Sequence, residues 1–120
     1  MPYLLVIEDD PLLGKLSLEA ARQLDLKAVL DENGDQYPAL IQEHGIPSLV
    51  LLDLHLPFAT GGDILQHLRA DAHLSGVPIL ITTADIIQAR NLQAQGEKVL
   101  LKPVSMLRLQ DIFTEYMTAG

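Results

Sequence analysis

Four short aliphatic runs constrain the possible folds of this chain most. They lack the alternation of apolar and polar residues that is typical of a strand with one solvated face. They cover residues 3–7, 49–52, 77–81 and 99–101. Strands with such a pattern are buried on both faces, as in a parallel sheet. A weaker fifth candidate, residues 27–30, ends shortly before an Asn-Gly turn pair. The sequence therefore predicts a parallel sheet buried between helices.

The segments that follow these runs have the spacing of helices with one apolar face. Their stripes are Leu13, Leu16, Ala20 and Leu24; Ala39 and Leu40; Ile64, Leu65 and Leu68; Ile86, Ala89 and Leu92; and Leu109, Ile112, Phe113 and Tyr116. We expect Asp35 to cap the second helix and Ser105 to cap the last. A strand–helix unit repeated five times predicts an α/β fold, a doubly wound parallel sheet with helices on both faces and right-handed crossovers.

Length, composition and charge narrow the range of possible functions. The chain has 120 residues, 48% of them hydrophobic and without a visible repeat or linker, so we expect one domain over residues 1–120 and no output domain. The net charge of −8 disfavours nucleic acid or an anionic membrane as the main partner. The chain has no cysteine, which excludes disulfides and thiolate metal sites. The first residues lack the features of a signal peptide, so a cytoplasmic location is expected.

Polar residues follow the predicted strands, at the edge where open parallel sheets bind ligands. Glu8 and Asp9 follow the first run, Asp53 the third strand, Thr83 the fourth and Lys102 the fifth. Carboxylates that lie this close repel one another, and a divalent cation relieves the repulsion. Because the expected ligands are oxygens alone, the ion is expected to be Mg²⁺, which commonly completes its coordination with phosphate oxygens.

This set of groups suits phosphoryl transfer to a carboxylate. Asp53 would accept the phosphoryl group as an aspartyl phosphate. The metal and the ammonium group of Lys102 would neutralise its oxygens, and the hydroxyl group of Thr83 would donate a hydrogen bond to one of them.

Single residues of the set also have ordinary structural explanations. Asp9 or Asp10 could cap a helix, and so could Thr82 or Thr83 before the next one. A carboxylate placed directly after four buried aliphatic residues, as Asp53 is, costs free energy unless it has a partner. The occurrence of all these groups at one predicted edge favours a site over separate structural roles.

Four motifs in a fixed order resemble the receiver domain of two-component response regulators, over essentially all 120 residues. They are LLVIEDDPLL, LVLLDLHLP followed by Gly61 and Asp63, ILITTA, and LLKP. The resemblance implies the flavodoxin-like strand order 2-1-3-4-5 and a cis peptide bond between Lys102 and Pro103. It also implies a signalling switch rather than an enzyme, one that catalyses no more than its own phosphotransfer and dephosphorylation.

The resemblance assigns roles to residues and implies partners. The implied roles are Asp53 as phosphoacceptor and metal ligand, Asp9 as a direct Mg²⁺ ligand, Glu8 as a ligand through water, the backbone carbonyl of His55 as a further ligand, and Thr83 and Lys102 as phosphoryl contacts. The implied phosphodonor is a sensor histidine kinase or a histidine phosphotransfer protein. The implied output is an effector or a homodimer at the surface formed by the fourth helix, fifth strand and fifth helix.

The chain departs from the family pattern at positions that matter for switching. Val99 stands three residues before Lys102, where most receivers carry an aromatic residue, so switching by rotation of that ring is not expected. His55 and Asp85 lie two residues beyond Asp53 and Thr83, at positions that tune the access of water in the family. We expect these two residues to set the lifetime of the phosphoryl group.

Two other functions are alternatives for a chain with these residues. One is a receiver-like scaffold that is never phosphorylated, which the intact acidic set disfavours. The other is a Mg²⁺-dependent phosphohydrolase of the haloacid dehalogenase type, which usually has a second acid two residues after the nucleophile, where this chain has His55. Nucleotide binding is disfavoured because no glycine-rich loop follows the first strand.

Overall fold

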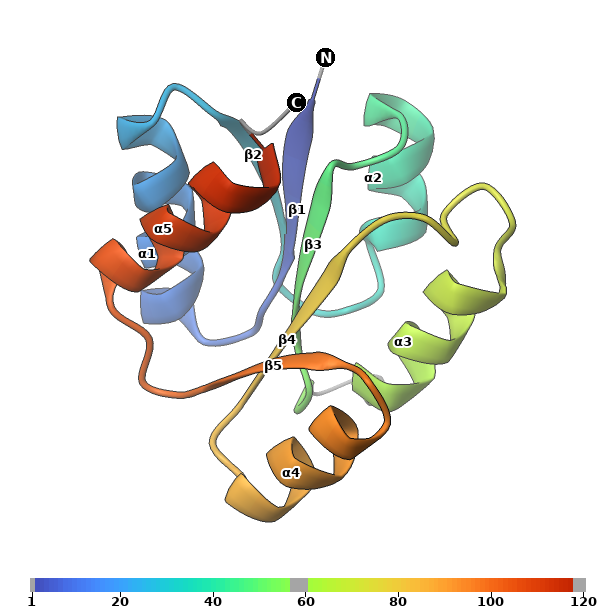
Figure 1. The fold of residues 1–120 in the computed structure, drawn as a ribbon. Coiled ribbons are helices and arrows are strands. Elements are labelled where there is room, and N and C mark those ends of the chain that lie inside the picture. Colours follow the sequence, from blue (N-terminus) through green and yellow to red (C-terminus); the bar gives the residue numbers. More distant parts are fainter. Residues whose placement is uncertain (1, 57–60, 118–120) are drawn as a thin grey trace.

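A computed structural model describes residues 2–56 and 61–117 of the chain, and strands and helices alternate throughout this part (Figure 1). The strands are β1 (Tyr3–Ile7), β2 (Lys27–Asp31), β3 (Leu49–Asp53), β4 (Ile79–Thr83) and β5 (Lys98–Leu101). The helices are α1 (Pro11–Gln23), α2 (Tyr37–His44), α3 (Gly61–Ala70), α4 (Ile86–Ala94) and α5 (Met106–Met117). The predicted fivefold repeat of strand and helix is confirmed.

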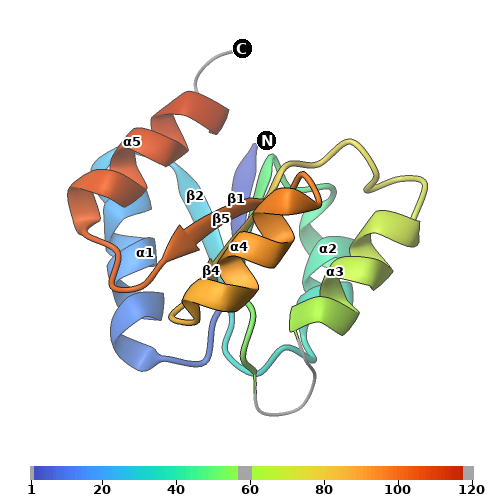
Figure 2. The same cartoon turned by 60° about the horizontal axis from the view of Figure 1, so that its bottom comes forward.

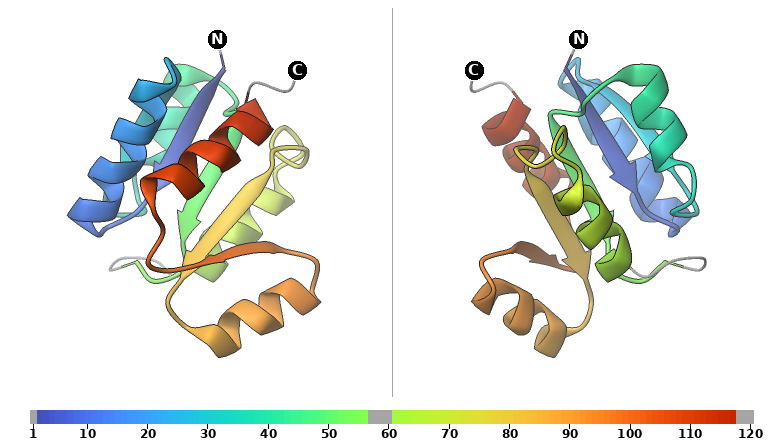
Figure 3. Two further views of the ribbon diagram at one scale, coloured as in Figure 1. Left: turned by 60° about the vertical axis from the view of Figure 1, so that its left-hand side comes forward. Right: turned by 90° about the vertical axis from the view of Figure 1, so that its right-hand side faces the viewer.

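The strands form one parallel sheet in the order β2-β1-β3-β4-β5, which confirms the strand order that the resemblance implied. Helices α1 and α5 cover one face of the sheet, and α2, α3 and α4 cover the other (Figure 3). Side chains of the three inner strands β1, β3 and β4 are buried throughout, while β2 and β5 at the edges are partly exposed. The aliphatic runs therefore lack alternation because both faces of the inner strands are packed.

Two predicted boundaries were wrong for local reasons. β4 begins at Ile79 rather than at residue 77, because the N–H of Val77 donates to the carbonyl of Leu74 in a turn and Pro78 has no N–H to donate. Asp35 does not cap α2, because Gln36 occupies the cap position and makes no side-chain cap hydrogen bond. The expected cap at Ser105 is confirmed, since its hydroxyl oxygen accepts a hydrogen bond from the N–H of Arg108 at 3.1 Å.

The carboxylate of Asp31 takes the place of the expected cap on α2. This side chain is fully buried at the end of β2 and accepts hydrogen bonds from four backbone N–H groups. The donors belong to Asn33, Gly34, Gln36 and Tyr37, at distances of 2.7 to 3.0 Å. One buried carboxylate therefore fixes both the turn after β2 and the first turn of α2.

Candidate functional site

The predicted site residues meet at the carboxyl end of the sheet, toward which Figure 2 looks. Glu8, Asp9 and Asp53 each place one carboxylate oxygen so that the three oxygens lie within 4.8 Å of one another. Glu8 and Asp53 are buried, with 3% and 2% of their surface exposed, while Asp9 is exposed. The site therefore has two buried carboxylates and an open side at Asp9.

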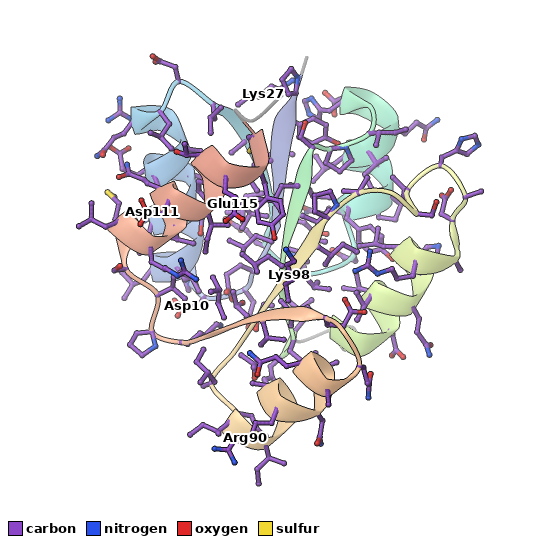
Figure 4. The ribbon with its side chains drawn as sticks, in the orientation of Figure 1. Asp10, Lys27, Arg90, Lys98, Asp111 and Glu115 are labelled. Carbon is purple, nitrogen blue, oxygen red and sulfur yellow. The ribbon has the colours of Figure 1, made fainter. Side chains whose placement is uncertain are left out.

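The two adjacent aspartates of the first loop, Asp9 and Asp10, have different roles in the structure. Asp10 is the N-cap of α1, because its side chain accepts a hydrogen bond from the N–H of Leu12 at 2.9 Å, ahead of Pro11 in the first turn. Figure 4 shows Asp10 at the start of this helix, near the loop after β5. The cap that the sequence allowed at either residue is thus Asp10, and Asp9 turns its carboxylate to the acidic cluster.

Asp53 is held in place by backbone on two sides. Its Oδ1 accepts a hydrogen bond from the N–H of His55 at 3.1 Å. α3 begins directly against the end of β3, since a Cβ at Gly61 would lie 2.5 Å from the carbonyl oxygen of Asp53 and from the Cα of Leu54. Glycine is therefore required at this close approach, which explains the glycine that follows the second motif.

Lys102 supplies the positive charge. Its Nζ lies 3.1 Å from Oε1 of Glu8 and 3.3 Å from Oδ1 of Asp53. The Lys102 backbone N–H donates to the carbonyl of Thr83 at 2.8 Å, which aligns the loop after β5 with β4. The peptide bond to Pro103 is cis, as the resemblance implied.

Burial and mutual repulsion perturb the acidic groups. Burial, together with a hydrogen bond to Asp53 and its charge, raises the pKa of Glu8 to about 8. Burial and the same neighbour raise the pKa of Asp9. Burial opposes ionisation of Asp53 as well, but hydrogen bonds from Glu8, Asp9 and the His55 amide and the charge of Lys102 hold its pKa below the ordinary value. Asp53 therefore ionises more readily than Glu8.

The charge on Lys102 is stabilised by the same cluster. Burial alone would lower the pKa of its ammonium group, but the carboxylates of Glu8 and Asp53 outweigh burial and raise it. A permanently charged ammonium group beside an ionised carboxylate is the arrangement that the phosphoryl-transfer prediction requires.

The acidic cluster fits a divalent cation. Its donors are oxygens, as Mg²⁺ prefers, and the pKa values of Glu8 and Asp9 are raised by burial first and then by the neighbouring Asp53, so a cation would stabilise their ionised forms. Among the predicted ligands, Glu8, Asp9 and Asp53 come together in the structure. The side chain of His55 is exposed, and its expected ligand atom, the backbone carbonyl, stays a prediction.

Thr83 lies at the end of β4, fully buried. Its Oγ1 accepts a hydrogen bond from the N–H of Asp85 at 3.1 Å, and Asp85 in turn caps α4 by accepting from the N–H groups of Ile87 and Gln88. The helix cap that the sequence allowed at Thr82 or Thr83 is therefore Asp85. Thr83 joins the end of the sheet to the start of α4 through this contact.

Sequence reasoning missed Asp31 as a residue that supports the site. Its backbone carbonyl accepts the N–H of Glu8 at 3.1 Å, while its side chain fixes the turn after β2. The signal was present in the order Asp-Glu-Asn-Gly, since an aspartate often accepts hydrogen bonds from the N–H groups of a turn that follows it. The described residues contain no helix that is long and apolar enough to cross a membrane.

Curated relatives of this chain include transcriptional regulatory proteins and response regulators. It is 31% identical over 107 residues to the transcriptional regulatory protein BaeR of Escherichia coli, covering 87% of this chain and 43% of that protein. It is 27% identical over 116 residues to the polar-differentiation response regulator DivK of Brucella anthropi, covering 94% of each. The chain thus spans about half or less of some relatives, such as BaeR, and nearly all of others.

Solved structures share the fold. The receiver domain of the sensor histidine kinase PA1611 from Pseudomonas aeruginosa, which has a magnesium ion coordinated in its active-site cleft, has a TM-score of 0.82 and 27% identity, with 98% of each chain covered. The chemotaxis response regulator CheY4 of Vibrio cholerae has a TM-score of 0.84 and 18% identity, covering 98% of this chain and 99% of that one. The family model of the response regulator receiver domain matches residues 4–114, and the chain therefore belongs to the response regulator receiver domain family.

Proposed function

We propose that the chain is a phosphorylation-controlled signalling switch in which Asp53 takes a phosphoryl group from a histidine kinase or a histidine phosphotransfer protein, in a Mg²⁺-dependent step. The observation that carries the proposal is an ionised, buried carboxylate with an ammonium group 3.3 Å away and two further carboxyl groups beside it. Family membership favours this switch over the phosphohydrolase that was considered from the sequence.

The residues have distinct tasks in the proposed transfer. A carboxylate oxygen of Asp53 attacks phosphorus, the bond from phosphorus to the donor imidazole nitrogen breaks, and its electron pair stays on the imidazole. Lys102 balances negative charge on the transferred group, and Glu8, Asp9 and Asp53 would hold the Mg²⁺ ion. The ion, when bound, neutralises charge on phosphoryl oxygens. Dephosphorylation follows when water attacks phosphorus and Asp53 leaves as a carboxylate.

The proposed output route begins at Thr83. If its hydroxyl group turns to a phosphoryl oxygen as a donor, the N–H of Asp85 loses or weakens its acceptor, and the cap of α4 is disturbed. This route needs no aromatic ring at Val99, which packs partly buried against the core. It gives the phosphoryl group an interaction that differs between two states, as a switch requires.

The proposed output surface lies on α4, β5 and α5. Apolar side chains are exposed on each element, namely Ile86 and Ile87 on α4, Leu101 on β5 and Leu107 on α5. Charged side chains lie on the same three elements, such as Arg90 on α4, Lys98 on β5 and Glu115 on α5, all labelled in Figure 4. An effector or a second copy of the chain is the proposed partner there, and the proposed location is the cytoplasm.

Intact-mass analysis with acetyl phosphate tests the proposal. The expected result is one base-labile phosphoryl adduct that forms with Mg²⁺, is absent with chelator and is absent in Asp53→Asn. Labelling of Asp53→Asn at the normal rate would refute the assignment of the acceptor. If neither acetyl phosphate nor histidine kinases label the chain and it binds no Mg²⁺, the unphosphorylated scaffold is the better explanation.

A further inference from the structure

Thr82 has a buried hydroxyl group without a partner. The residue is 1% exposed, and its Oγ1 makes no hydrogen bond to any described residue. A buried hydroxyl group in this situation costs free energy relative to a methyl group of the same size, so it calls for an explanation. Its neighbour Thr83 differs, because the hydroxyl oxygen of Thr83 already accepts from Asp85.

Thr82 lies on the same face of the sheet as Asp53. The two residues are partners in the register of β3 and β4. Two residues earlier on each strand, Leu51 and Leu80 both belong to the core under α1 and α5, whereas Leu52 and Ile81 belong to the opposite core. Because side chains alternate along a strand, Thr82 and Asp53 share the face of α1 and α5.

The side chain of Lys102 crosses this position. Lys102 follows β5, whereas its partner Asp53 ends β3, and β4 lies between these two strands. The ammonium group must therefore pass over the end of β4 to reach Asp53. Lys102 also lines a pocket with Leu13 and Leu16 of α1, which places it on the face that Thr82 shares.

The acceptors that Lys102 uses are those that a cation would take. In the structure its ammonium group contacts Glu8 and Asp53, two of the three carboxylates of the acidic cluster. A cation bound to these carboxylates repels the ammonium group and competes for the same oxygens. Lys102 then needs another acceptor, and Thr82, on the same face of the sheet as Asp53, offers an oxygen that accepts no hydrogen bond from the described residues.

We propose that Thr82 is a positioning residue for Lys102, whose ammonium group donates a hydrogen bond to the Thr82 hydroxyl oxygen when a cation occupies the acidic cluster. The inference rests on the proposed function, since it requires the cation site. Thr82 thereby keeps the charge of Lys102 beside Asp53 without holding it on the metal-binding oxygens. In this arrangement the Thr82 hydroxyl oxygen, which accepts no hydrogen bond from the described residues, gains a donor when the ammonium group leaves Glu8 and Asp53.

The test compares Thr82→Val, which replaces the hydroxyl group with a methyl group, with Thr82→Ser, which keeps it. Ile81→Val, one position away on the opposite face, controls for general loosening of β4. Each protein is titrated with Mg²⁺ alone by calorimetry and unfolded by urea with Mg²⁺ and with chelator. Thr82→Val is also combined with Lys102→Met, which keeps an unbranched side chain and removes the ammonium group.

The expected result is that Thr82→Val has opposite effects on stability in chelator and on Mg²⁺ affinity. Thr82→Val is more stable than the wild type in chelator, because an unpaired hydroxyl group is gone, yet binds Mg²⁺ roughly tenfold more weakly, as expected for a lost hydrogen bond to a charged group. Thr82→Ser binds Mg²⁺ like the wild type. In the Lys102→Met background, Thr82→Val leaves Mg²⁺ affinity unchanged.

Three outcomes would overturn the inference. Equal Mg²⁺ affinity of Thr82→Val and the wild type, or an equal loss in the Lys102→Met background, would show that Thr82 does not act through Lys102 and would leave the proposed function intact. Failure of the wild type to bind Mg²⁺ would instead remove the proposed cation site, and this inference with it.

Discussion

The ammonium nitrogen of Lys102 lies 3.1 Å from Oε1 of Glu8, although 94 residues separate the two in the sequence. This contact joins the loop after β5 to the end of β1, two strands that are not neighbours in the sheet. It compensates for part of the cost of burying Glu8, whose pKa is nevertheless raised to about 8 by burial and by Asp53. The protonation of this site therefore depends on pH.

The first prediction concerns pH in the absence of metal. The folded state binds the proton of Glu8 more tightly than the unfolded chain, because the pKa of this group rises from an ordinary 4.5 to about 8. The stabilising contribution of this proton is complete below about pH 4.5 and is lost as the pH rises through about 8. Urea unfolding in chelator is therefore expected to show a decrease of this contribution between these values.

Glu8→Gln provides the control, since it keeps the shape of the side chain and cannot ionise. Its unfolding free energy is expected to vary less with pH over the same window. Mg²⁺ is expected to reverse the trend in the wild type and to stabilise it more at about pH 8 than at about pH 6, because binding releases the proton of Glu8. The same pH profile for wild type and Glu8→Gln in chelator would contradict the prediction.

The second prediction separates the acceptor from the metal ligand. Asp53→Asn is expected to abolish phosphorylation, because an amide oxygen is a poor nucleophile. Asp9→Ala is expected to abolish or greatly weaken it by removing a carboxylate from the cation cluster. Asp10→Ala is the matched control, since this residue caps α1 and is expected to cost stability while labelling persists. Quantitative intact mass after incubation with acetyl phosphate reports all three variants.

The third prediction concerns the link from Thr83 to α4. Asp85→Ala removes the side-chain cap of α4 and is expected to cost about 1 kcal/mol of stability. If phosphorylation acts through this cap, the variant should also lose the difference in hydrogen exchange of the first turn of α4 between the phosphorylated and unphosphorylated forms. Asp85→Asn, which can still accept a hydrogen bond at the cap, is expected to keep that difference. An unchanged difference in Asp85→Ala would rule out this route.

The fourth prediction concerns Asp31. Its buried carboxylate accepts hydrogen bonds from four backbone N–H groups, so Asp31→Ala would leave these donors unpaired and is expected to cost about 2–4 kcal/mol. Asp31→Asn retains one carbonyl oxygen and is expected to cost less. Urea denaturation measures both. A loss below about 0.5 kcal/mol in Asp31→Ala would mean that the turn does not depend on this side chain.

The fold was largely predictable because it follows from local patterns. Buried strands without alternation identified β1 and β3 at their observed starts, and the polar residues after each strand identified Asp53 and Lys102. What could not be predicted depends on contacts made in three dimensions. The first turn of α2 is capped by the Asp31 side chain, six residues before Tyr37. The usual N-cap residue accepts a hydrogen bond from a residue only two or three positions later, so this cap could not be predicted from the sequence.

The different roles of adjacent identical residues also could not be predicted from the sequence. Asp9 and Asp10 are chemically identical, and the choice between cap and cluster follows from the direction in which the chain leaves β1. Thr82 and Thr83 differ in the same way, because they lie on opposite faces of β4. The sequence could not show which residue of each pair has which role, because the path of the loop decides between Asp9 and Asp10 and the strand register decides between Thr82 and Thr83.

The span of the Glu8–Lys102 contact has a consequence for biosynthesis. Glu8 emerges from the ribosome long before Lys102, and a partly synthesised chain would carry the acidic residues without their counter-charge. Since β5 pairs with β4 alone, the ammonium group arrives when the edge of the sheet is completed. The acidic residues therefore gain their counter-charge only when the fifth strand has joined the sheet.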